Sequence, residues 1–212
     1  MKFICYMYVS IAYAFFLLLD FAGQYAAVSN GIKYSIILIL FFHSVWILKK
    51  SKENIRTQRS VINIALFCVC VADYFLLFTK FYEPGIWFFL WVQFCYRVLG
   101  NIKKKKEAIS RKEKITAGIL LFQVIFLFFH TKFVLVMLAL EYALFSILNL
   151  CEMWRCYRRK VFSCILPLVV TFLFMCDIQV VLWDVFQFSL SGKLIWLFYV
   201  PSQVLLEKYG DL

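Results

Sequence analysis

Long apolar runs separated by short polar segments make up the sequence. A helix needs about 17–25 mostly apolar residues to cross a bilayer core that is roughly 30 Å thick. Somewhat shorter runs are tolerated within a packed bundle. The candidate spans are eight runs, at residues 3–21, 33–48, 61–79, 85–99, 115–130, 133–151, 161–182 and 193–206. The sequence therefore predicts one all-α domain over residues 1–212, a bundle of eight transmembrane helices.

The weakest boundary in this pattern is Thr131-Lys132, because the runs on either side of it could form one long span. The basic residues bear on this choice, since most of them fall in alternate loops. One set of loops holds only Lys33, Lys80, Lys132 and Lys193. The other set holds Lys49, Lys50, Lys52, Arg56 and Arg59; Arg97, the Lys run at 103–106, Arg111, Lys112 and Lys114; and Arg155, Arg158, Arg159 and Lys160. By the positive-inside tendency the second set and both termini are cytoplasmic, which requires an even number of spans and favours the break.

Composition agrees with a membrane protein and excludes other classes. Of the 212 residues, 64% are hydrophobic and 17% are charged, against about 45–50% and about 25% in soluble domains. With 7 Gly and 3 Pro the chain is neither collagen-like nor disordered. The 8 Cys include no C-x-x-C pair, and no phosphate loop or zinc helix occurs. We therefore expect neither a metal nor a cofactor.

Two further features bear on location and partners. Lys2, the first apolar run and the small residues after it are also typical of a secretory signal peptide, but the run is long and its leading segment has a single Lys. We therefore expect an uncleaved first span in a multi-pass protein of the cell membrane. The net charge of +11 and the Lys run at 103–106 predict basic cytoplasmic loops that lie on anionic lipid headgroups. Nucleic acid is not an expected partner, because no aromatic platform or folded domain accompanies the run.

Two aspartates lie within predicted spans, where a charged side chain costs at least about 2.5–3.5 kcal/mol and by default marks a functional interior. Asp73 and Asp177 follow the starts of their spans by 12 and 16 residues. Both spans run outward, so both carboxyls are expected about 18–24 Å from the cytoplasmic face, in the outer half. No basic residue is close in sequence to neutralise either one. We expect a catalytic pair, with one carboxyl protonated as an acid and the other ionised as a base.

Other polar residues of the spans reach overlapping depths, and a cavity open to the outer half of the membrane would bring them together with the aspartates. Helical spacing places Gln93 and Tyr96 on one face of their span, and Tyr199 and Gln203 on one face of theirs. The full set of predicted lining residues is His43, Gln93, Tyr96, Glu141, Tyr142, Tyr199 and Gln203.

These polar residues also have a purely structural interpretation. His43 with Ser44, and Tyr142 with the Ser146 and Asn149 that follow it, are more often interhelical hydrogen bonds than catalytic groups. Glu141 needs only a neighbouring donor. Asp20 and Asp184 lie near the interfaces, where we expect solvent around them.

Two segments match the motifs of a known family. The first has Ala72-Asp73 and Leu76, then Gly85, Phe89, Gln93 and Tyr96; the second has Cys176-Asp177, then Leu194-Ile195, Tyr199 and Gln203. Together they resemble the YhhN family of lysoplasmalogenases, with its GD-x-x-L motif, its G-x-x-x-F-x-x-x-H-x-x-Y helix, its SD segment and its closing L-I-x-x-x-Y-x-x-A-Q helix. Lys33 and Tyr142 also fall where the family tends to have such residues. The resemblance covers nearly the whole chain in the number and order of spans.

The resemblance implies a lysolipid substrate and an ether-bond hydrolysis without metal or organic cofactor. A vinyl ether is hydrolysed by protonation at carbon, which forms an oxocarbenium ion that water attacks. One aspartic acid would deliver the proton, and the other, as a carboxylate, would stabilise the cation and orient the water. Burial of the alkenyl chain would contribute about 0.8 kcal/mol per CH₂.

Three departures from the family motifs motivate a second hypothesis, in which the fold binds a lipid or signals without turnover. Ala72 replaces the Gly before the first Asp, Cys176 the Ser before the second, and Gln93 the His of the intervening helix. Gln keeps hydrogen bonding and loses a titratable group. A small transporter, with the acids as proton relays, ranks last, because no Gly or Pro next to either Asp marks an unwound segment.

Overall fold

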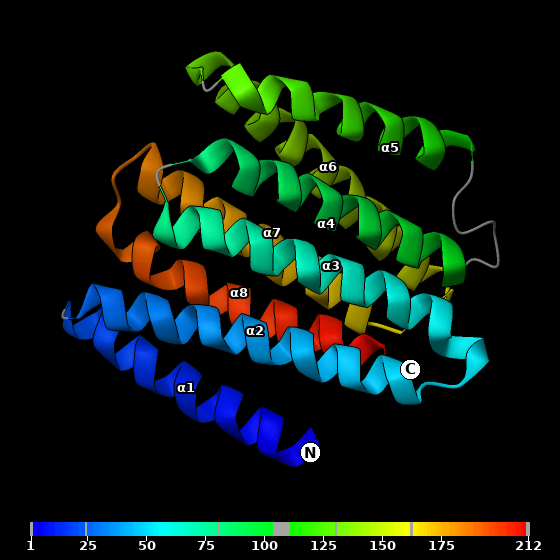
Figure 1. The fold of residues 1–212 in the computed structure, drawn as a ribbon, viewed down its shortest axis with the longest axis horizontal. Helices are drawn as coiled ribbons and strands as arrows, with labels where there is room; N and C mark the ends of the chain where they lie inside the picture. Colours follow the sequence, from blue (N-terminus) through cyan, green and yellow to red (C-terminus); the bar gives the residue numbers. More distant parts are fainter. Residues whose placement is uncertain are drawn as a thin grey trace.

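The regular structure of the described residues is entirely helical (Figure 1). A computed structural model describes residues 2–23, 25–79, 81–103, 111–129, 131–161 and 163–210. The helices are α1 (Lys2–Ala22), α2 (Ala26–Lys50), α3 (Glu53–Phe78), α4 (Tyr82–Lys103), α5 (Arg111–Phe122), the 3₁₀ helix η1 (Gln123–Phe129), α6 (Lys132–Arg158), α7 (Ile165–Asp184) and α8 (Ser189–Tyr209). The predicted all-α fold is confirmed for these residues. Most helices extend past the apolar runs that predicted them, whereas α7 begins four residues after the start of its run, 161–182.

The break at Thr131-Lys132 separates two helical segments, as predicted. Thr131 is the N-cap of α6, and its hydroxyl accepts a hydrogen bond from the Val134 N–H at 3.3 Å. On the other side, α5 has 12 residues and η1 adds 7. At about 1.5 Å and about 2 Å of rise per residue these two would extend roughly 30 Å together, close to the thickness of a bilayer core.

Within the described residues, five helices are long and apolar enough to cross a membrane, namely α1, α2, α3, α6 and α7. Large apolar side chains on the outer faces of these helices are exposed, including Phe3 on α1 and Phe133 on α6. By contrast, α8 contacts four other helices, α7, α2, α1 and α3, and buries polar residues such as Gln203 and Glu207 among them.

The order of the helices across the bundle places α1 and α5 at opposite edges (Figure 1). Between them, α3 packs against α2, α4 and α8, and α7 packs against α6 and α8. Within α8, Pro201 has no N–H to bond to the carbonyl of Leu197. The Tyr13 hydroxyl of α1 donates to that carbonyl at 3.0 Å instead. The carbonyl that Pro201 leaves without an intrahelical hydrogen bond therefore joins α8 to α1.

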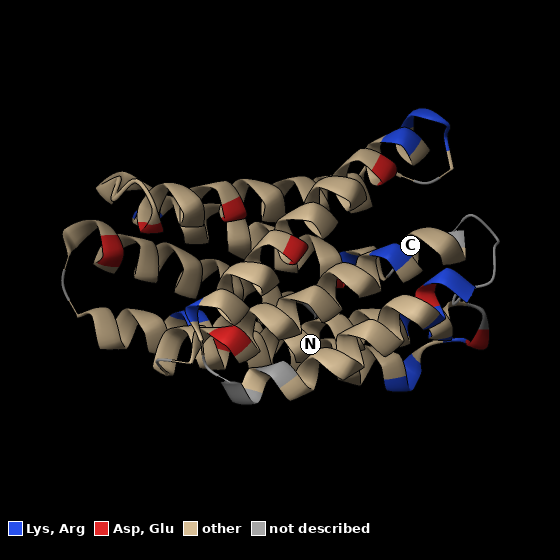
Figure 2. Cartoon of the chain, turned by 90° about the horizontal axis from the view of Figure 1, so that it is seen from above, with Lys and Arg blue, Asp and Glu red and all other residues tan. Residues whose placement is uncertain are grey.

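Most of the Lys and Arg residues gather at the end of the bundle where α8 ends (Figure 2). Most of the basic residues that were predicted to lie in loops belong to helices, among them Arg59 and Arg97. Arg59 belongs to α3 and is fully buried, and Arg97 belongs to α4 with its guanidinium 5.9 Å from the centre of the Phe145 ring. The loop assignment of Arg59 is therefore wrong, because an acidic partner inside the bundle makes burial of its charge possible. The remainder of the Lys run, residues 104–106, lies outside the described residues.

Candidate functional site

Asp73 is a buried carboxyl held by a tyrosine. Its helix, α3, faces α8, and the Tyr199 hydroxyl of α8 donates to both Asp73 oxygens at 2.9 Å. Only 3% of Asp73 and 4% of Tyr199 is exposed. Asp73 lies five residues before the end of α3, which confines this pair to the end of the bundle opposite the basic one.

Asp177 has a matching arrangement on α7. The Tyr142 hydroxyl of α6 lies 3.0 Å from both carboxylate oxygens, and the Ser146 hydroxyl donates to Oδ2 at 3.2 Å. Tyr142 and Ser146 are one helical turn apart and therefore share a face of α6. Asp177 is half-buried, so it keeps more access to the surroundings than Asp73 does.

A helix between the two carboxyls, α4, connects their surroundings. The Phe89 ring makes edge-on contacts with both tyrosines, with centroids 6.1 Å from Tyr142 and 6.2 Å from Tyr199. One turn further, Gln93 donates through Nε2 to Ser146 Oγ at 2.7 Å, and its Oε1 accepts from Asn149 Nδ2 at 2.9 Å. The two carboxyl–tyrosine pairs therefore lie on either side of Phe89.

The side chains that bind the two aspartates carry neutral hydroxyls. Within the described part of the chain, no Lys, Arg or His forms an ion pair with either carboxyl. A hydroxyl can donate to a carboxylate, and it can accept from a carboxylic acid. Such a site tolerates both protonation states, as proton transfer requires. Among the described residues, no three His, Cys, Asp or Glu side chains are grouped to hold a metal ion.

Of the predicted lining residues, the structure brings Tyr142, Tyr199 and Gln93 to the aspartates. Tyr96 and Gln203 are buried between α4 and α8, one turn nearer the basic end than Gln93 and Tyr199. Ser146 and Asn149, which the sequence favours as structural residues, complete the hydrogen bonds around Asp177 and Gln93. Their helical spacing from Tyr142 is the signal that points to them.

Glu141 and His43 do not join the aspartates. Glu141 accepts a hydrogen bond from Gln123 of η1 at 2.5 Å, so it faces the α5 edge of the bundle. His43 belongs to a second cluster, in which its Nδ1 lies 3.2 Å from Glu207 Oε1. The predicted lining residues are thus divided among three places.

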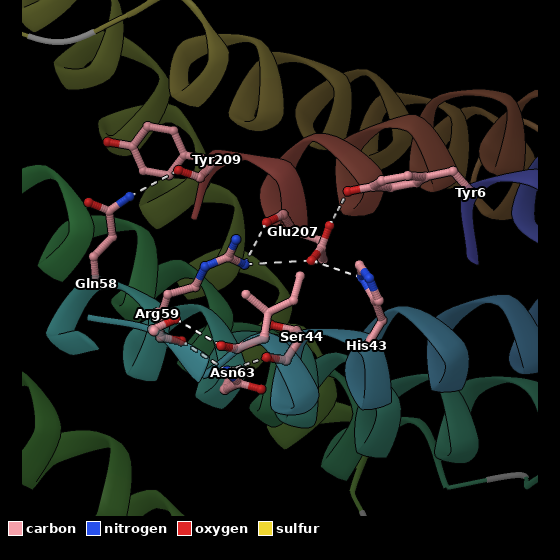
Figure 3. Close-up of polar contacts among 10 residues, drawn as sticks. Tyr6, His43, Ser44, Gln58, Arg59, Asn63, Glu207 and Tyr209 are labelled. Atoms are coloured by element: carbon pink, nitrogen blue, oxygen red, sulfur yellow. Dashed lines mark hydrogen bonds and ion pairs between the residues drawn. The ribbon is translucent and has the colours of Figure 1, made fainter. Parts of the chain in front are cut away.

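The second cluster is centred on Glu207, which is fully buried near the end of α8 (Figure 3). The Tyr6 hydroxyl donates to Glu207 Oε2. Arg59 Nη1 lies 3.5 Å from Oε1 and donates to the Glu207 carbonyl at 3.0 Å. Four helices, α1, α2, α3 and α8, thus supply one ion-paired network. Glu207 is not among the predicted site residues, although its place four residues after Gln203 on the same helical face could have pointed to it.

A third buried charge lies near the opposite end of the bundle. Lys33 Nζ is 2.7 Å from Asp20 Oδ2, with 8% and 14% of the two side chains exposed. Ser29 donates to the other Asp20 oxygen at 2.5 Å. The expectation that Asp20 is solvated is therefore wrong, because α2 brings a cation and a hydroxyl to it.

Two shallow cavities among the described residues lie beside α1. One, of about 220 Å³, is lined mainly by Val9, Tyr13, Val200 and Val204 between α1 and α8. The other, of about 260 Å³, lies between α1 and α2 and includes His43. Neither lining includes Asp73 or Asp177.

Comparison of the chain with protein-family models, with curated proteins and with solved structures finds no match.

Proposed function

We propose that this chain is an intramembrane hydrolase that cleaves the vinyl ether bond of lysoplasmalogen-type lysolipids, as the family that its motifs resemble does. The observation that carries the proposal is the pair of carboxyls, Asp73 and Asp177, each bonded to a tyrosine hydroxyl and separated by Phe89. Two acids without ionic partners in an apolar bundle suit a reaction that needs one proton donor and one carboxylate.

The proposed topology has eight spans, with both termini on the cytoplasmic side of the cell membrane. The gathering of basic residues at one end of the bundle supports this orientation (Figure 2). The helices α4 and α8, and α5 continued by η1, would span beside the five helices that are apolar enough alone. In this orientation the aspartates lie in the outer half, within reach of a lysolipid in the bilayer.

In the proposed reaction, one aspartic acid protonates the vinyl ether at the carbon that is not bonded to oxygen. The resulting oxocarbenium ion is stabilised by the other carboxylate, which also orients a water molecule for attack. The carboxylate accepts the proton that the attacking water releases, and the hemiacetal that forms collapses to a fatty aldehyde and a glycerophospho-base. Tyr199 and Tyr142 would hold the two carboxyl groups in place through both protonation states.

Release of aldehyde from lysoplasmalogen by the purified protein in lipid vesicles tests this proposal. Asp73→Asn and Asp177→Asn should each lower the rate by about 10²–10⁴-fold, the usual contribution of a general acid or base. Glu141→Gln is the matched control, because Glu141 faces Gln123 and should retain the rate. Absence of aldehyde from a folded preparation, or full activity of both Asp variants, would contradict the proposal.

A second candidate function is lipid binding without turnover, and Gln93 favours it. Its side chain donates to Ser146, accepts from Asn149 and has no titratable group. Under this alternative a bound lysolipid stays intact during incubation. The two Asp→Asn variants would then change lipid affinity or stability, while conversion of the lipid to aldehyde would exclude the alternative.

A further inference from the structure

A polar stripe runs along the inner face of α8 between the two clusters. Tyr199, Gln203 and Glu207 recur every four residues and therefore share one face of the helix. All three are buried, and Gln203 and Glu207 have no exposed surface. At about 1.5 Å per residue, the stripe covers roughly 12 Å from Tyr199 to Glu207.

The two ends of this stripe have hydrogen-bond partners. At one end Tyr199 donates to Asp73. At the other, Glu207 is bound by Tyr6, His43 and Arg59 (Figure 3). Both ends also connect α8 to α3, through Asp73 and Arg59, so the stripe lies along the contact between these antiparallel helices.

The middle of the stripe lacks partners. Within the part of the chain that the structure describes, neither the amide nitrogen nor the amide oxygen of Gln203 has a hydrogen-bond partner, and neither does the Tyr96 hydroxyl. Gln203 and Ser202 lie close to that hydroxyl without hydrogen-bonding geometry, and Ser202 donates to the Val169 carbonyl instead. Buried polar groups normally have hydrogen-bond partners. The protein itself therefore leaves the hydrogen-bonding capacity of the Gln203 amide and the Tyr96 hydroxyl unused.

More polar atoms without partners lie beside this stripe, on α2 and α3. Because α3 and α8 are antiparallel and Arg59 contacts Glu207, we infer that Asn63, one turn further along α3, lies near the level of Gln203. Asn63 Nδ2 donates to the carbonyls of Arg59 and Ser44 at 3.1 and 3.4 Å. Asn63 Oδ1, Ser44 Oγ and His43 Nε2 have no partner among the described residues (Figure 3).

We propose that a file of buried water molecules runs along α8 from the Glu207 cluster to the Asp73–Tyr199 pair. Its binding groups are the Gln203 amide, the Tyr96 hydroxyl, and the Asn63 and Ser44 oxygens. A buried water typically makes about three hydrogen bonds to polar groups that would otherwise lack partners, and these groups supply both donors and acceptors. The file would bring the water that hydrolysis consumes to Asp73; this role rests on the proposed function, whereas the file itself does not.

Radiolytic labelling in heavy-oxygen water tests for the file, because hydroxyl radicals formed from bound water label the side chains beside it. The full chain in lipid nanodiscs is irradiated, and heavy-oxygen incorporation is measured at Tyr96 and at Phe16. Both side chains are fully buried, but Phe16 packs among apolar and aromatic neighbours. Tyr96 should be labelled at least about tenfold faster than Phe16 if ordered water lies against it.

The variant Gln203→Leu should reduce Tyr96 labelling to the rate of Phe16, because leucine removes both amide partners of the water. Gln123→Leu, at the α5 edge of the bundle, is the matched control and should leave the labelling unchanged. If Gln203→Leu does not fold, Ser44→Ala provides a milder break in the file.

Equal labelling of Tyr96 and Phe16 in the unmodified protein would overturn the proposal, as would rapid Tyr96 labelling that survives Gln203→Leu. The labelling needs no turnover, so it distinguishes failure of the water file from failure of the hydrolase proposal. Slow Tyr96 labelling together with aldehyde release would refute only the proposed water file. Fast Tyr96 labelling without aldehyde release would refute only the proposed hydrolase activity.

Discussion

Asp73 and Glu207 are two buried carboxyls at opposite ends of one helix contact, and their partners differ. Glu207 is surrounded by Arg59, His43 and the Tyr6 hydroxyl. Asp73 is bound by the Tyr199 hydroxyl alone among the contacts described for its side chain. Both are buried against the same pair of helices, so depth in the bundle does not explain the difference.

This difference in partners indicates different roles for the two carboxyls: Glu207 stabilises the bundle, and Asp73 is suited to proton transfer. A buried ion pair is costly to break, because removal of one partner leaves the other charge uncompensated. A carboxyl that is bonded to a neutral hydroxyl keeps its hydrogen bond whether it is protonated or ionised. We infer that the Glu207 cluster ties α1, α2, α3 and α8 together, whereas Asp73 and Asp177 remain able to exchange protons. Stability measurements on variants of each region test this difference.

The largest effect on stability is expected for Arg59→Met, which keeps the volume and removes the cation. Glu207 would be left buried without its main counter-charge, and we expect the free energy of unfolding to fall by about 3–5 kcal/mol. Denaturation in mixed micelles measures it. Arg97→Met is the control, with a loss below about 1 kcal/mol, since its guanidinium lies over a half-buried ring. Equal losses for the two variants would contradict a structural role for the Glu207 cluster.

A smaller effect is expected for Tyr199→Phe, which removes the donor to Asp73. A hydrogen bond to a charged group contributes about 1.5–3 kcal/mol, and we expect a loss of stability within that range. Tyr142→Phe should cost less, because Asp177 is half-buried and keeps its bond from Ser146. The same unfolding assay compares the two variants, and the reverse order would show that Asp177 depends more on its tyrosine.

Gly210→Ala probes the packing around Arg59 without changing any charge. A Cβ at Gly210 would lie 2.6 Å from the guanidinium carbon of Arg59, which is fully buried and has little room to move. We expect a loss of about 1 kcal/mol, at the lower end of the usual cost of overpacking. At Gly118 a Cβ would meet nothing within 4 Å, so Gly118→Ala should be neutral or stabilising in the same melts.

The smallest effect is expected for Gln123→Ala at the α5 edge. It removes one hydrogen bond to the half-buried Glu141, which is worth roughly 0.5–1.5 kcal/mol. If the preparation releases aldehyde, the rate should be unchanged, because Glu141 lies apart from both aspartates. A loss of rate that matches Asp73→Asn would instead place Glu141 in the candidate site.

Much of the fold follows from local patterns in the sequence. Runs of apolar residues long enough for a bilayer predict the helices, and Thr131 marks the start of α6 because its hydroxyl can cap a helix. Asp73 and Asp177 stand out because charged residues are rare within such runs. Tyr142 and Ser146 are linked by helical spacing, which is also a local property.

The partners of each polar group do not follow from such patterns. Arg59 has the same sequence context as the Lys residues before it, and only contact with α8 shows that it is buried. The sequence predicts that His43 and Gln93 both line a cavity with the aspartates. In the structure, His43 of α2 binds Glu207, whereas Gln93 of α4 binds Ser146. Helical periodicity assigns a residue to a face, and packing decides which helix that face meets.

Three features follow from the sequence alone: the helical segments, the basic end of the bundle and the two aspartates without basic neighbours. Each of them depends only on residues that are close together in the chain. The tertiary structure decided that Asp73 and Asp177 bind tyrosines on either side of Phe89, and that Glu207 binds Arg59 and His43. Asp73 and Tyr199 are more than a hundred positions apart in the chain, and so are Arg59 and Glu207. Hydrogen bonds and ion pairs act over a few ångströms, so only the packing of the helices could select them.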